Sequence, residues 1–147
     1  MIKYEMRKAC RKDIPILVRY KLTNILEYAD SATLEEQDQI EGYVQAEMKT
    51  ELENAQMVMV EGKTVGCLVV TKKDDGMLID EIYLEEDYRN QGIGTSCLEQ
   101  LLQKYSTLYL WVYKLNHQAI SLYQKLGFQI IMETESRYYM KYKRINK

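Results

Sequence analysis

A glycine-containing loop in the middle of the chain has the composition of a phosphate site. It reads Arg89-Asn90-Gln91-Gly92-Ile93-Gly94 and separates a stretch of strand character from a stretch of helical character. The first N–H groups of a helix have no partner within the helix and lie at the positive end of its dipole, so such an end can receive phosphate. An ordinary surface loop could also contain these residues. The spacing fits neither the dinucleotide fingerprint nor the P-loop.

Two adjacent carboxylates, Asp80 and Glu81, interrupt the apolar stretch before this loop. A central strand covered on both faces should be apolar, and a buried carboxylate is costly unless it is paired. Each residue could form an ion pair with an Arg or Lys, or could receive a cationic amine. A substrate ammonium has a pKa of about 10.4 and must lose a proton before it can attack, which a carboxylate can accept. Strand alternation predicts opposite faces for the two residues.

The hydrophobic pattern predicts the elements that would position these residues. A short strand over 3–8 precedes a helix that begins at Asp13 and contains Pro15, and a second helix begins near Thr33, where Thr33 and Glu36 form a capping-box pattern. The remaining elements are strands over 57–60, 64–71 and 77–84, a helix over 91–105, a strand over 108–113, a helix begun by Asn116 and closed by Gly127, and strands over 128–132 and 138–142. This order predicts one mixed α/β (α+β) domain spanning residues 1–147.

Composition narrows the classes of function. The chain has 147 residues and a formal net charge of -2. This balance gives no case for a nucleic-acid partner, and no apolar run approaches the ~20 residues of a membrane span. Cys10, Cys67 and Cys97 show no short C-x-x-C spacing, which argues against a disulfide framework and a zinc site. We therefore expect a cytoplasmic protein without a structural metal, with Cys67 and Cys97 as core residues.

Two motifs in order give the chain a family resemblance. The run from Arg89 to Gly94 resembles the R/Q-x-x-G-x-G/A signature of the GCN5-related N-acetyltransferase (GNAT) family, and Asn116, Ala119, Tyr123 and Gly127-Phe128 resemble a second family pattern. The resemblance implies a central, mostly antiparallel sheet with a splayed parallel strand pair, flanked by helices. It also implies acetyl-CoA as co-substrate and direct transfer of the acetyl group to an amine.

The resemblance assigns the cofactor to a strand, the loop after it and a later helix. The pantetheine arm would pair with the backbone of the strand, and the pyrophosphate would lie on the loop amides. The expected cofactor contacts are Ile82, Tyr83, Leu84, Arg89, Asn90, Gln91, Gly92, Ile93, Gly94, Thr95, Asn116 and Tyr123.

The resemblance also suggests catalytic residues. Tyr123 matches the usual general acid, although its position on an apolar helix stripe equally fits a packing residue. Asp80 matches an acidic residue of polyamine and aminoglycoside acetyltransferases of the family, which makes Asp80 the first choice for handling the amine and Glu81 the reserve. The chain departs from other members at Trp111 and Leu78, where those carry an acidic residue. His117 is expected to be an exposed residue of a first helical turn.

The leading hypothesis is an N-acetyltransferase that acts on a small cationic amine or a peptide amine. The alternative is a non-catalytic module that binds acetyl-CoA. Glu27, Asp30, Glu35, Glu36 and Asp38 favour a cationic acceptor, whose identity stays open. Tyr138, Tyr139 and Tyr142 would line either a pocket or a homodimer contact.

Overall fold

Seven strands form one sheet in the order β1-β2-β3-β4-β5-β7-β6. The computed structural model describes residues 2–28 and 34–145. The strands are β1 (Glu5–Lys8), β2 (Ala55–Val60), β3 (Lys63–Lys73), β4 (Gly76–Leu84), β5 (Thr107–Tyr113), β6 (Gln129–Glu133) and β7 (Arg137–Lys143). All neighbouring pairs are antiparallel except β4 and β5, which are parallel. These are the strands that the sequence predicts, although β1 is shorter than expected and most of the others are longer.

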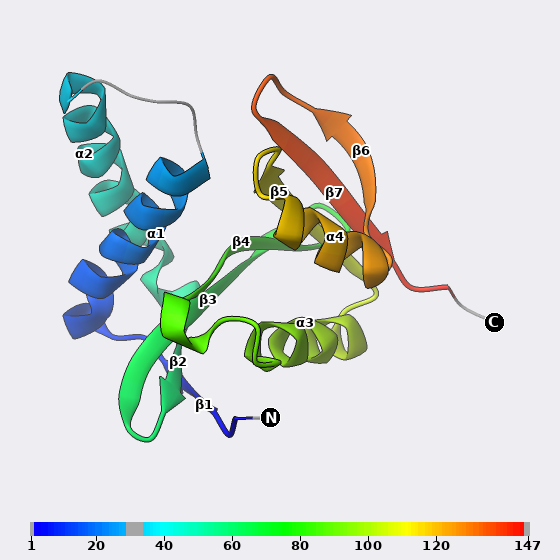
Figure 1. Cartoon of the computed structure of the whole chain (residues 1–147), viewed down its shortest axis with the longest axis horizontal. Helices are drawn as coiled ribbons and strands as arrows, with labels where there is room; N and C mark the ends of the chain where they lie inside the picture. The colour runs from blue at the N-terminus through cyan, green and yellow to red at the C-terminus, as the bar shows by residue number, and fades with distance from the viewer. Residues whose placement is uncertain (1, 29–33, 146–147) are drawn as a thin grey trace.

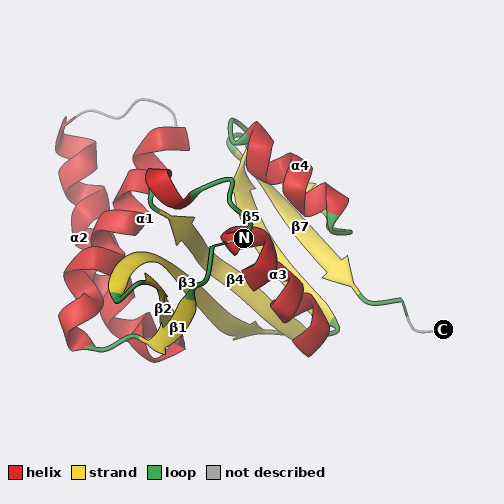
Figure 2. Ribbon diagram, turned by 60° about the horizontal axis from the view of Figure 1, so that its bottom comes forward, coloured by secondary structure: helices red, strands yellow, loops and turns green. Residues whose placement is uncertain are grey.

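The helices cover both faces of the sheet. They are α1 (Ile14–Tyr28), α2 (Leu34–Glu51), α3 (Ile93–Lys104) and α4 (His117–Lys125). Figure 1 shows α1 and α2 side by side, away from α3 and α4, and Figure 2 shows the two pairs on opposite sides of the sheet. In the part of the chain that the structure describes, no helix is long and apolar enough to cross a membrane.

The start of α1 differs from the prediction. A 3-10 turn, Arg11–Asp13, precedes the helix, so Asp13 ends this turn instead of capping α1. Its carboxylate accepts the Cys10 N–H at 2.8 Å and pairs with Arg7 at 2.9 Å. The capping box predicted for Thr33 and Glu36 lies outside the residues whose side chains are described, as do Asp30, Glu35 and Asp38.

Each face of the sheet has its own apolar core. Leu17, Val44 and Met57 are buried where α1 and α2 pack on the sheet, together with Cys67. Leu98, Leu108 and Phe128 are buried on the side of α3 and α4. Fully burying one such side chain contributes about 1.5–3 kcal/mol. Cys97 is buried as well, so both cysteines expected in the core are there.

The parallel pair β4–β5 separates part of the way along its length. Pairing runs only from Met77 opposite Leu108 to Ile79 opposite Leu110. Gly76 permits the close approach at the paired end, because a Cβ atom there would lie 2.5 Å from the Thr107 carbonyl oxygen. Beyond Ile79 the two strands splay apart, as the family resemblance implies, and the resulting fork positions the site.

Candidate active site

Two cavities meet at the fork between β4 and β5. The first is a groove of about 310 Å³ between the end of β4, the glycine loop, α3 and α4. The second is a cavity of about 830 Å³ between the fork and the helices α1 and α2. Asn24, Ile82, Asn116 and Tyr123 line both. A molecule in the groove could therefore reach one in the cavity at these residues.

The glycine loop exposes backbone N–H groups to the groove. Gly92 has φ of 90° and precedes α3, and the first helical bond runs from Ser96 N–H to the Gly92 carbonyl. The amides of Ile93, Gly94 and Thr95 consequently have no partner within the helix. An added Cβ at Gly94 would have Leu84 Cδ1 as its nearest neighbour, at 3.7 Å, so the position is free of clashes with the protein itself.

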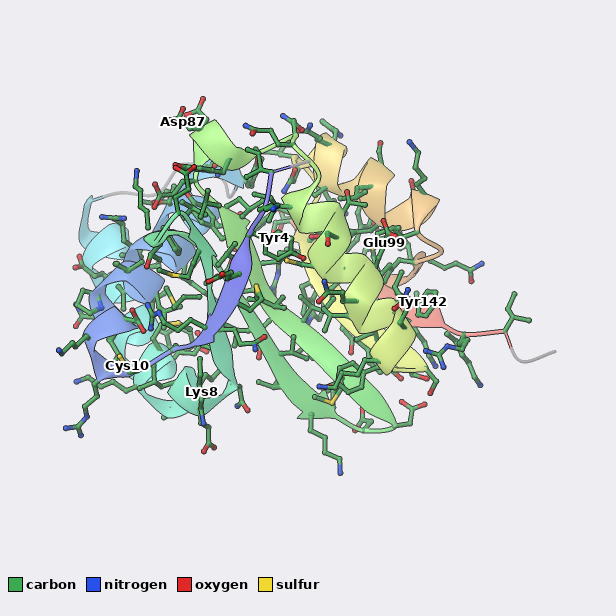
Figure 3. The ribbon with its side chains drawn as sticks, turned by 90° about the horizontal axis from the view of Figure 1, so that it is seen from below. Tyr4, Lys8, Cys10, Asp87, Glu99 and Tyr142 are labelled. Atoms are coloured by element: carbon green, nitrogen blue, oxygen red, sulfur yellow. The ribbon has the colours of Figure 1, made fainter. Side chains whose placement is uncertain are left out.

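Neighbouring elements hold this loop in place. The Tyr4 and Ser96 hydroxyls are hydrogen-bonded at 2.7 Å, which ties the residue before β1 to the first turn of α3. Figure 3 shows Tyr4 beside this helix, with Asp87 in the turn that precedes the loop. This contact supports the first turn of α3, where the amides lie.

Arg89 links the loop to β4 and α1. Its Nε donates to the Leu84 carbonyl at 2.7 Å, and an Nη atom lies 3.6 Å from Glu27 Oε1. The guanidinium carbon lies 5.2 Å from the centre of the Tyr83 ring. Part of its charge is therefore already compensated, so Arg89 shapes the groove as well as making it positive.

The end of β4 offers a free edge to the groove. Glu85 N–H donates to the Val65 carbonyl of the neighbouring segment at 2.8 Å. Backbone groups alternate in direction along a strand, so those of Leu84 and Ile82 point to the opposite side, where β5 has separated. The Leu84 carbonyl already accepts a hydrogen bond from Arg89. The Leu84 N–H and both Ile82 groups remain for an extended ligand.

A β-bulge at Asp80 corrects the expected alternation. Ile79 pairs with Val70 and Glu81 with Val69, which leaves Asp80 without an opposite residue on β3. A bulge places two successive residues where one would stand, and the side chains beyond it change face. Asp80 and Glu81 therefore both point to the side of α1 and α2, and the prediction of opposite faces was wrong.

Both carboxylates line the larger cavity, in different surroundings. Asp80 Oδ2 accepts the Thr71 hydroxyl at 2.8 Å. The Glu81 side chain is only 4% exposed, and its partner is Lys21, with Nζ at 3.9 Å from Oε2. Burial raises the pKa of Glu81 to about 8; the Lys21 charge opposes this, while Glu47 and Asp80 reinforce it. In its ionised form, a carboxyl with this pKa can accept a proton from a bound group.

Glu47 and Glu51 are two further ionisable groups near Lys21, Asp80 and Glu81. Glu47 Oε1 lies 3.4 Å from Lys21 Nζ. Burial lowers the pKa of Lys21, but the nearby carboxylates outweigh burial, so the net shift is upward and Lys21 keeps its charge. Burial, then the charges of Asp80 and Glu47, raise the pKa of Glu51 to about 7, and its Oε2 atom is buried without a hydrogen-bond partner.

Tyr123 can be both a packing residue and a proton donor, the two roles that the sequence allows. Its ring is buried and packs against Phe128 with 5.8 Å between ring centres. Burial, followed by the charge of Glu81, raises the pKa of its hydroxyl above the usual range, so the hydroxyl stays protonated at neutral pH. Because Tyr123 also lines both cavities, it can donate a proton at their junction.

Asn116 and His117 open α4. Asn116 caps the helix, with Oδ1 accepting the Ala119 N–H at 3.2 Å. Its side-chain amide nitrogen remains available to the junction. His117 is exposed, as predicted.

Sequence reasoning missed the site residues on α1 and α2: Lys21, Asn24, Tyr28, Glu47 and Glu51. A signal was present, because Lys21 and Asn24 are polar residues four and seven positions after the buried Leu17, on the same helical stripe. Trp111 also lines the larger cavity, and the Arg137 guanidinium carbon lies 4.5 Å from the centre of its ring. Among residues 2–28 and 34–145, no group of three or more His, Cys, Asp or Glu side chains is arranged to hold a metal ion.

Comparisons with known proteins show what the chain is similar to. Residues 21–128 match the model of the Acetyltransferase (GNAT) family. A spermine/spermidine N(1)-acetyltransferase of Bacillus subtilis is 33% identical over 63 residues, which is 39% of this chain and 41% of that protein. N-alpha-acetyltransferase 50 of Danio rerio is 43% identical over 58 residues, covering 35% and 34% of the two chains. Both matches therefore span well under half of each curated relative.

A solved structure shares the whole fold. The paia N-acetyltransferase of Thermoplasma acidophilum, solved in complex with coenzyme A, has a TM-score of 0.80 and 19% identity, covering 97% of this chain and 100% of that one. At this level of identity the likeness concerns the arrangement of helices and strands.

Proposed function

The chain belongs to the GNAT acetyltransferase family, and from this membership we propose that it transfers the acetyl group of acetyl-CoA to a primary amine. The relatives named above are an acetyltransferase of small amines and an N-alpha-acetyltransferase, which supports an amine acceptor. The groove at the glycine loop would take the co-substrate, and the larger cavity would take the amine.

The residues of the groove fit acetyl-CoA. The unpaired amides of Ile93, Gly94 and Thr95 suit the pyrophosphate, and the free edge of β4 at Ile82 suits the pantetheine arm. The amide nitrogen of Asn116 would contact the same arm. Bound there, acetyl-CoA supplies an activated acetyl group.

The residues at the fork would handle the protons. Glu81 would accept one proton from the ammonium and thus free the nitrogen lone pair for attack on the acetyl carbon. As the C–N bond forms and the C–S bond breaks, Tyr123 would donate its proton to the sulfur and regain one from the nitrogen. The products are an amide, coenzyme A as a thiol and one proton, which leaves from Glu81.

Asp80 would attract the cationic amine, with Thr71 holding its carboxylate. Glu81 is the preferred base because its pKa lies near neutrality. The single observation that carries the proposal is that the groove and the cavity share Asn24, Ile82, Asn116 and Tyr123 at the point where β4 and β5 separate.

A thiol-release screen against a panel of amines tests the proposal. The panel contains alkylamines, polyamines, aminoglycosides, amino acids and short peptides with free N-termini. We expect thiol release with at least one amine, and a large loss of turnover in Tyr123→Phe. If the protein binds acetyl-CoA but no amine releases thiol above the amine-free rate, the non-catalytic alternative replaces the proposal.

A further inference from the structure

The ammonium group of Lys21 lies in the larger cavity between two carboxylates. Lys21 Nζ is 3.4 Å from Glu47 Oε1 and 3.9 Å from Glu81 Oε2. The Lys21 side chain is 16% exposed. All three residues line the same cavity as Tyr123. The chain thus places a primary alkylammonium group of its own where the carboxylates could receive one from a ligand.

The contact with Lys21 does not give the Glu81 carboxylate a hydrogen-bond donor. A separation of 3.9 Å is longer than a direct N–H···O hydrogen bond. In the part of the chain that the structure describes, no side chain or backbone group donates a hydrogen bond to the Glu81 carboxylate. A carboxylate this deeply buried normally has a donor. Its orientation into the cavity leaves room for a ligand to supply one.

We propose that Glu47 and Glu81 form the ammonium subsite for the acceptor, that Lys21 occupies this subsite in the free protein, and that the acceptor is a primary amine on an unbranched alkyl chain. The inference rests on the proposed function, because it assigns the acceptor of that same reaction. In this account the incoming amine displaces Lys21 from Glu81, and Lys21 determines specificity by competing with the acceptor.

The surroundings of the subsite favour an alkylamine over a peptide α-amine. Ile25, Ile40 and Val44 line the same cavity and offer apolar contact to methylene groups. An α-amine carries a branched carbon and a neighbouring amide, whose polar atoms would lose their water against this lining. A straight chain matches the shape of the lysine side chain that already occupies the subsite.

A thermal-shift experiment tests the subsite without acetyl transfer. Lys21→Ala removes the part of the side chain that n-propylammonium reproduces. We expect n-propylammonium to raise the unfolding midpoint of Lys21→Ala by about 3–5 °C at roughly ten times its Kd. Neutral n-propanol should give no comparable shift, and the shift should disappear in Lys21→Ala combined with Glu47→Gln. Lys49→Ala removes an exposed lysine of α2 and should show no amine-specific shift.

Kinetics then test whether the subsite serves the acceptor. With acetyl-CoA present, Lys21→Ala should acetylate n-propylamine with a KM about tenfold lower than that of the wild type, because the competing ammonium is gone. Lys21→Met keeps the apolar stem and safeguards the test if Lys21→Ala does not fold. Lys21→Met also lacks the competing ammonium. In this variant we therefore expect a lower KM for a diamine longer than n-propylamine, with kcat changed much less than KM.

Several results would overturn the inference. In one such result, propylammonium stabilises Lys21→Ala but is not acetylated by it, although the wild type acetylates other amines. Glu47 and Glu81 would then hold only a structural cation. A higher acceptor KM in Lys21→Met, or a higher kcat/KM for a peptide α-amine than for any alkylamine, would do the same. If the wild type acetylates no amine at all, the proposed function falls with the acceptor role, and any thermal shift marks a cation site alone.

Discussion

The buried carboxyl of Glu81 should make the stability of this protein depend on pH in a specific way. Its pKa is raised from 4.5 to about 8 by burial. At neutral pH most folded molecules therefore hold a proton on Glu81 that the unfolded chain has already lost. Glu81 acts as a base and as the charged partner of an ammonium group in its ionised fraction, which grows as the pH rises through about 8. The contribution of this protonated group to stability is complete below about pH 4.5 and is lost as the pH rises through about 8.

The size of the pKa shift of Glu81 gives the size of its effect on the free energy of unfolding. A move of the pKa from 4.5 to about 8 corresponds to about 5 kcal/mol in favour of the protonated form. Between these values the free energy of unfolding should fall by about 1.4 kcal/mol per pH unit, because the folded state binds one proton more than the unfolded state. Glu81→Gln keeps the shape and cannot ionise, so it should lack this slope.

Urea denaturation of the wild type and of Glu81→Gln across this pH range measures the difference directly. The difference in unfolding free energy should shift in favour of the variant by about 1.4 kcal/mol per pH unit. Glu99→Gln, at an exposed position of α3 marked in Figure 3, controls for the loss of a surface carboxylate and should change stability by less than about 0.5 kcal/mol. A flat difference between wild type and Glu81→Gln would mean that Lys21 keeps Glu81 ionised in the folded protein, and the assignment of Glu81 as base would lose its physical support.

Three other substitutions separate binding from chemistry. Gly94→Val should weaken acetyl-CoA binding by about tenfold or more in titration calorimetry, because a branched side chain would enter the groove; unchanged affinity in a folded variant would refute the pyrophosphate position. Tyr123→Phe should lower kcat by about a hundredfold with acetyl-CoA affinity nearly intact, and wild-type turnover would make Tyr123 a packing residue. Asp80→Asn should raise the KM for a cationic acceptor more than it lowers kcat, and an unchanged KM would exclude Asp80 from acceptor capture. The kcat/KM of the wild type should rise with pH through an apparent pKa near 8, and Glu81→Gln should lose this rise.

Local patterns were sufficient to predict the elements and the groove. The cap at Asn116 and the glycine loop each rest on residues adjacent in sequence, and each is present in the structure. The Asp80 bulge could not be predicted in this way. Its presence is defined by the register against β3, which depends on how Val69 and Val70 pair across the hairpin.

The acceptor side of the site depends on tertiary packing. Lys21 on α1 and Glu47 on α2 meet Glu81 on β4 only because both helices pack on that face of the sheet. A carboxylate in a strand pattern indicates that a partner must exist, but the pattern does not identify it. The pKa of Glu81 likewise follows from the depth of burial, which the sequence does not specify.

The proposed reaction transfers an acetyl group directly from acetyl-CoA to a primary amine at the fork. The most direct measurement uses acetyl-CoA labelled in the acetyl group, with mass spectrometry of both the amine and the protein after one turnover. We expect an alkylamine to gain the labelled acetyl group, the mass of the protein to stay unchanged and Tyr123→Phe to slow the gain. Label on no amine, despite binding of acetyl-CoA, or label that passes through the protein before it reaches the amine, would contradict it.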